Sequence, residues 1–145
     1  MSRVKHLFAV VLAALMLCLL MPVAAFAEEA SDGKMLIYAK LPSDWSAPHL
    51  WAWADDGTNA FDAWPGGEME ADSNNDGWYY CWIPETTNNI IINANDAAVQ
   101  TSDYKLESKN AWVTVTDAEN VEISYDAQTT GDLPEYVEKF KIHAQ

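Results

Sequence analysis

One short stretch constrains the fold of this chain more than any other, and it reads Leu50-Trp51-Ala52-Trp53. Successive side chains of a β-strand point to opposite faces, so the two tryptophans share one face while Leu50 and Ala52 share the other. A polar turn follows at residues 55–59, and Trp64 comes just before Pro65-Gly66-Gly67. The stretch therefore predicts a strand with one aromatic face, followed by a turn that carries a further aromatic side chain.

The three tryptophans of this stretch, Trp51, Trp53 and Trp64, allow two interpretations. Large aromatic side chains in a small β-domain usually fill the core. However, Leu50 and Ala52 already form a face suited to the core, which places Trp51 and Trp53 outside. Exposed tryptophans in a group indicate a ligand. The pattern alone leaves both interpretations open.

Residues 1–27 have the features of a secretory signal peptide. Arg3 and Lys5 form a positive start, an uncharged apolar run extends over residues 7–21, and Ala25-Phe26-Ala27 is a small-x-small cleavage site. The apolar run is short for a membrane span. We therefore expect cleavage after Ala27 and a secreted, extracellular protein without an anchor.

The remaining chain is strongly acidic. Removing 27 of the 145 residues leaves 118, enough for a single domain. The remaining chain has six Lys and Arg residues and 22 Asp and Glu residues, which gives a net charge of −16. Such a surface repels phosphate backbones and anionic membranes, so we expect neither nucleic acid nor membrane as a partner. A neutral ligand remains compatible with this charge.

One cysteine, Cys81, remains after the signal peptide, so no disulfide is expected within the chain. It lies in the strand-like run Trp78–Ile83, where a buried small hydrophobe is the expected role. A nucleophilic cysteine needs a neighbouring base, and the mature chain offers only His49 and His143.

The rest of the chain alternates in the manner of short β-strands. Polar residues, glycines and prolines separate the apolar runs, which cover residues 36–41, 49–54, 78–83, 89–93, 111–116 and 121–126. This spacing predicts an all-β, immunoglobulin-like antiparallel β-sandwich. We expect the sandwich to occupy residues 28–126 and a short C-terminal tail to follow over residues 127–145.

Catalytic and metal-binding motifs are not evident. Residues Asp72–Gly77 open like a calcium loop, but the twelfth position, which needs a carboxylate, is Ile83. We interpret the segment as a polar hairpin turn, with a weak calcium site at Asp72–Asp76 as the alternative. Carboxylate pairs for glycoside hydrolysis exist in any acidic chain and indicate little. The sequence thus predicts no catalytic residue, no metal site and no cofactor.

What remains is aromatic and amide chemistry. Sugars present apolar C–H faces that stack on flat rings, and hydroxyl edges that hydrogen bond to planar polar side chains. Trp51, Trp53 and Trp64 can supply the rings. Gln100, next to Thr101, can supply the amide, although an ordinary loop residue is the alternative.

The order of these motifs resembles the starch-binding carbohydrate-binding modules of family 26, with family 25 as the nearest relative. The resemblance covers roughly residues 35–104, and more loosely the strands to Tyr125. It rests on Leu36-Ile37-Tyr38, Trp45, Trp51-x-Trp53, Ala63-Trp64-Pro65-Gly66 with Met69, Gly77-Trp78-Tyr79, Ile83-Pro84, Ile90–Asn93 and Gln100-Thr101.

The resemblance implies roles for particular residues. Trp51, Trp53 and Trp64 would form a platform for the glucan, and Gln100 would hydrogen bond to sugar hydroxyls. The family often has tyrosine at the first two positions. The loop over residues 93–99 is also less rich in glycine than the usual family loop.

The function implied is that of a secreted, non-catalytic module that binds α-1,4-glucan without a cofactor. Its partners would be starch, amylopectin and maltooligosaccharides, together with an extracellular amylase or a surface protein. Two alternatives stay open: a small extracellular glycoside-active enzyme, and an immunoglobulin-like module that binds another protein through its tail.

Overall fold

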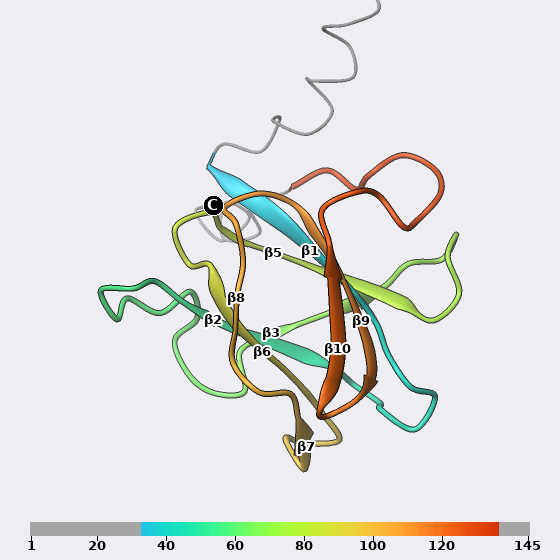
Figure 1. Cartoon of the computed structure of the whole chain (residues 1–145), viewed down its shortest axis with the longest axis horizontal. Helices are drawn as coiled ribbons and strands as arrows, with labels where there is room; N and C mark the ends of the chain where they lie inside the picture. Colours follow the sequence, from blue (N-terminus) through green and yellow to red (C-terminus); the bar gives the residue numbers. More distant parts are fainter. Residues whose placement is uncertain (1–32, 137–145) are drawn as a thin grey trace, which may run out of the picture. The chain divides into compact units, whose positions relative to one another are not determined.

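The structure is a computed structural model that describes residues 33–136, and all regular secondary structure in this range is β-strand (Figure 1). The predicted signal peptide and the end of the predicted tail, residues 137–145, lie outside the described residues. Within the described range, no segment forms a helix with the length and apolar character needed to cross a membrane.

Two five-stranded sheets make up the fold. The first sheet has the order β10 (Asn120–Ser124), β9 (Ala111–Asp117), β1 (Lys34–Lys40), β5 (Trp78–Pro84) and β4 (Glu70–Ala71). The second sheet has the order β3 (Gly67–Glu68), β2 (His49–Trp53), β6 (Asn89–Ala94) and β7 (Val99–Gln100), and β8 (Tyr104–Lys105) also pairs with β6.

The predicted immunoglobulin-like sandwich is confirmed, with one departure from purely antiparallel pairing. β1 pairs with β9 in parallel, with Ile37 opposite Ala111. The other strand pairs are antiparallel. Parallel neighbours need a long connection. Here the chain between β1 and β9 is long enough to build the whole second sheet together with β4 and β5 of the first sheet.

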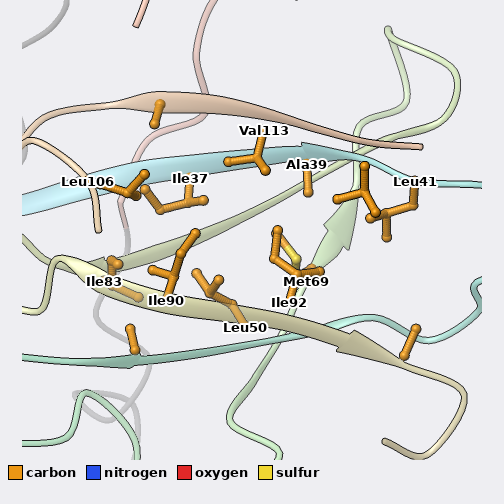
Figure 2. Close-up of a cluster of buried hydrophobic side chains, with 14 of the residues drawn as sticks. Ile37, Ala39, Leu41, Leu50, Met69, Ile83, Ile90, Ile92, Leu106 and Val113 are labelled. Atoms are coloured by element: carbon orange, nitrogen blue, oxygen red, sulfur yellow. The ribbon is translucent and has the colours of Figure 1, made fainter. Parts of the chain in front are cut away.

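The core between the sheets follows from the period of two within each strand. β1 contributes Ile37 and Ala39, while β6 contributes Ile90 and Ile92, and all four are at most 1% exposed. Figure 2 shows these side chains meeting between the layers. Burial of a side chain of this size stabilises the fold by about 1.5–3 kcal/mol. Met69, which separates β3 from β4, also enters the core where the chain crosses between sheets.

A second apolar cluster covers the opposite face of the first sheet. The residues of β1 that alternate with the core residues, Leu36 and Tyr38, pack here with Trp78 and Trp112. The Tyr38 ring stacks on Trp112 at 5.7 Å between centroids and 9° between planes. Trp78 is buried, and it lies in this outer cluster rather than between the sheets.

The C-terminal segment, residues 127–136, covers that outer cluster. Trp112 Nε1 donates a hydrogen bond of 3.0 Å to Thr129 Oγ1, and Leu133 packs against the cluster. Thr130 is fixed by Asn75, whose Nδ2 donates to the Thr130 carbonyl while its Oδ1 accepts from the Thr130 amide. The segment therefore acts as a cover for an aromatic layer that would otherwise face solvent.

Two smaller predictions can be compared with the structure. Residues 72–77 connect β4 to β5 as a polar hairpin turn, in which Asp72 accepts hydrogen bonds from the Asn74 amide and from Asn75 Nδ2. No group of three or more acidic, histidine or cysteine side chains within residues 33–136 is arranged to hold a metal ion.

Cys81 was expected to be buried, but it is only half-buried. Its side chain packs against the core, and it stays partly exposed because β4 covers β5 only up to Tyr80.

We predict that stability falls steeply at alkaline pH because of Tyr38. Burial, and then the nearby negative charge of Asp72, raise the pKa of Tyr38 to about 12. The unfolded chain ionises this phenol near its ordinary pKa of about 10, so the unfolding free energy is lost progressively between about pH 10 and 12.

Urea unfolding of the wild type and of Tyr38→Phe across this pH range tests the point. The variant should lose less stability with rising pH than the wild type, whatever its stability at neutral pH. Equal losses would contradict the assignment to Tyr38.

Candidate functional site

The outer face of the second sheet carries the aromatic side chains that the sequence singled out. Leu50 and Ala52 of β2 are fully buried against the core. Trp51 and Trp53 therefore point the other way, as predicted, and both are half-buried. The core side of β2 thus determines which residues the strand presents outside.

Trp64 completes this surface, which we call the tryptophan face and define by Trp51, Trp53 and Trp64. Trp64 is 42% exposed, the single exposed large hydrophobic residue in the part of the chain that the structure describes. Its ring meets Trp51 edge to face, with 6.0 Å between centroids and 69° between planes. The two rings therefore form an angled pair rather than a flat stack.

Two glycines allow the loop that bears Trp64 to lie against β2. Gly66 has φ of +106°, and a Cβ there would collide with the carbonyl oxygen of Leu50. Gly67 leaves space for the ring of Phe61, which packs against the core. The Trp64–Pro65 peptide bond is cis. The backbone can pass this close to β2 only where side chains are absent.

Asn93 of β6 is a site residue that the sequence reasoning missed. It is fully buried, and its Nδ2 donates a hydrogen bond of 3.1 Å to the carbonyl of Pro65, which fastens the Trp64 loop to the sheet. Its Oδ1 has no hydrogen-bond partner among the described residues. The sequence could have indicated this position. Ile90 and Ile92 alternate as core residues along the strand, so Asn93 must point to the outer face.

Gln100 lies on the same outer face as the tryptophans. Its register partner is Asn93, whose partner on the other side is His49 of β2. With strands about 4.8 Å apart and about 3.4 Å per residue, the backbones of Gln100 and Trp51 are about 12 Å apart. The structure thus places Trp51, Trp64 and Gln100 around Asn93.

Trp53 lies farther from Gln100, about 7 Å beyond Trp51 along β2. At this end Asn89 Nδ2 donates to the Trp53 carbonyl and to Asp55 Oδ1, at 3.0 Å each. Lys105 forms an ion pair of 2.7 Å with the same carboxylate. The hydrogen bonds from Asn89 and Lys105 hold the pKa of Asp55 below its ordinary value.

Thr101 has a structural role, unlike its neighbour Gln100. Thr101 is buried, and its Oγ1 accepts a hydrogen bond of 3.1 Å from the amide of Ile92. It fastens the chain after β7 to β6, while Gln100 remains exposed on the outer face. Of this pair, only Gln100 can meet a ligand.

The loop before Gln100 adopts a left-handed turn without any glycine. Asn95, Asp96 and Ala97 all have positive φ, between 56° and 63°. Asn95 supports this conformation, since its Oδ1 accepts a hydrogen bond from the Ser46 amide and its Nδ2 donates to the carbonyl of Asp44. Left-handed residues other than glycine need such support, and they are common at ligand-binding sites.

The chemistry of this surface suits a ligand with flat apolar faces and polar edges. Trp51, Trp53 and Trp64 offer ring faces, and the exposed amide of Gln100 offers both a donor and an acceptor. A β-sandwich with such a surface belongs to the class of small binding modules.

Comparison with known families places the chain within that class. A model of the family described as Starch-binding module 26 matches residues 37–106. The resemblance predicted from the sequence is thereby confirmed over this part of the chain. A search of curated proteins gave no match.

Two solved structures share the fold. One is the family 26 module CBMbc of Eubacterium rectale Amy13K, solved in complex with maltoheptaose, at 23% identity and a TM-score of 0.52. The match covers 67% of this chain and 52% of that one, so the chain spans about half of that structure. The other is the CBM25-1 module of a Paenibacillus polymyxa β/α-amylase, at 18% identity and a TM-score of 0.50 over 66% and 93% of the two chains.

We predict that Gly66→Ala destabilises the protein more than Gly57→Ala. Both glycines have positive φ, so both substitutions strain the backbone, but a Cβ at Gly57 meets nothing within 4 Å. Only Gly66→Ala adds the collision with the Leu50 carbonyl.

Thermal melting of both variants measures the difference, which should be at least about 1 kcal/mol. Tryptophan emission of Gly66→Ala should also change as Trp64 leaves Trp51. Equal melting temperatures would show that the loop does not depend on this close approach.

Proposed function

We propose that this protein is exported and binds starch without cleaving it, by stacking glucose rings of an α-1,4-glucan on the tryptophan face. The observation that carries the proposal is the exposed Trp64 ring held edge to face against Trp51 on the outer side of the second sheet. The sequence features of residues 1–27 support export.

The comparisons support α-glucan as the ligand. Residues 37–106 match a starch-binding family, and the Eubacterium rectale module was solved with maltoheptaose bound. Amylopectin, soluble starch and maltooligosaccharides are therefore the ligands that we propose. A net charge of −16 after export is compatible with these neutral ligands but not with anionic polymers.

A binding role also fits the nature of the surface. Stacking needs flat rings that stay in place, and the Trp51–Trp64 contact together with the Asn93 hydrogen bond fixes them before a ligand arrives. Rings ordered in advance lose little entropy on binding. An extracellular amylase or a surface protein would supply hydrolysis or retention. Release of reducing sugar from starch by the purified protein would contradict the non-catalytic role.

We predict that Trp64→Ala keeps the fold but loses most starch binding. Truncation of an exposed side chain usually changes stability by less than about 0.5 kcal/mol. The buried Trp78 is the matched contrast, since a buried tryptophan replaced by alanine costs about 3–5 kcal/mol.

Melting curves and native gels with and without amylopectin measure both properties. Trp64→Ala should melt like the wild type and be retarded by amylopectin far less than the wild type, whereas Trp78→Ala should melt markedly earlier or fail to express. A folded Trp64→Ala that is still retarded like the wild type would refute the proposed role of this ring.

Binding should also be nearly independent of salt. A neutral sugar releases no counterions, so the affinity for soluble starch should change little between low and moderately high ionic strength. Isothermal titration at two salt concentrations is sufficient. A steep loss of affinity would indicate a charged ligand.

A further inference from the structure

A cavity of about 670 Å³ opens where the chain crosses from β3 of the second sheet to β4 of the first. β5 forms one wall with Tyr80, Cys81 and Trp82. Phe61 forms another wall, and the C-terminal segment closes the third with residues 134–136. Its volume is in the range of small-molecule binding sites, about 300–1,000 Å³.

The short length of β4 explains why β5 lines a cavity here. β4 pairs with β5 only at Tyr79 and Tyr80, whereas β1 follows β5 from Trp78 to Pro84. Beyond Tyr80, the side of β5 away from β1 faces the cavity instead of a neighbouring strand. Trp82, in this part of β5, is half-buried.

The aromatic rings of the cavity are held in place by their neighbours. Trp82 and Tyr136 meet edge to face, with 5.8 Å between centroids. The ammonium group of Lys34 lies 5.3 Å from the centroid of the Tyr136 ring, a cation–π contact that adds to the contact with Trp82. The C-terminal segment thus contributes an oriented ring to the site.

Carboxylates stand beside these rings. Glu68, Glu70 and Glu135 line the cavity, and the Tyr80 hydroxyl donates a hydrogen bond of 2.9 Å to Glu70 Oε2. Carboxylates accept hydrogen bonds from hydroxyl groups and repel anions. Rings next to hydroxyl acceptors suit a sugar here, as rings next to the Gln100 amide do on the tryptophan face.

We propose that this cavity is a second binding site for a short, neutral α-glucan segment, separate from the tryptophan face. The proposal rests on the proposed function, because the same ligand class is recognised twice. Two sites on one small domain would raise the apparent affinity for a polymer without raising the affinity for a short oligosaccharide at either site.

Isothermal titration of the full chain with maltotriose tests this directly. The wild type should bind two molecules, and Trp64→Ala should bind one. Tyr136→Ala should also bind one, by losing the cavity. The double variant Trp64→Ala/Tyr136→Ala should bind none. Tyr125→Ala is the matched control, because Tyr125 also lies under a lysine, Lys109, but does not line the cavity. It should keep both sites.

Trp82→Ala provides a second variant on the β5 wall, and its melting curve shows whether it is folded. One site in the wild type, lost entirely with Trp64→Ala, would overturn the second site and leave the proposed function intact. Two sites that both survive Tyr136→Ala and a folded Trp82→Ala would also overturn it. If the wild type binds no α-glucan at all, both proposals fail.

Discussion

The burial of Leu50 and Ala52 is the constraint on which the rest of this structure depends. Both side chains are fully enclosed in the core, so β2 must turn Trp51 and Trp53 outward. The following loop then returns across the same strand, and it can do so because Gly66 lies against the Leu50 carbonyl. One apolar face of a five-residue strand therefore determines where the aromatic rings of the candidate site stand.

Both outer faces of the sandwich carry aromatic residues, but the two faces differ in their exposure to solvent. On the first sheet, Tyr38, Trp78 and Trp112 are buried beneath the C-terminal segment, where their contacts contribute to stability. On the second sheet, Trp64 remains exposed. The same residue type thus stabilises the fold on one face and stays available for a ligand on the other. The difference arises because the C-terminal segment covers the aromatic residues of the first sheet.

What the sequence predicted was local, and what it missed depends on residues far apart in the chain. The period of two in residues 49–53 and in the other apolar runs specified the long strands and the outward side of β2. The parallel pairing of β1 with β9 was not evident, because it is decided by the connection between them. The hydrogen bond from Asn93 to Pro65 and the partial exposure of Cys81 likewise depend on loop closure and on the length of β4. The roles of Trp51, Trp53, Trp64 and Gln100 remain predictions, although the structure places all four on one face.

The indole N–H signals of the seven tryptophans offer the most direct test of the central claim, because each ring reports separately in an ¹H–¹⁵N spectrum. Titration with maltotriose should move the signals of Trp51, Trp53 and Trp64, with Trp82 following if the cavity is occupied. The signals of the buried residues Trp45, Trp78 and Trp112 should stay in place. An unchanged Trp64 signal in a protein that binds the sugar would contradict the account of how this surface works.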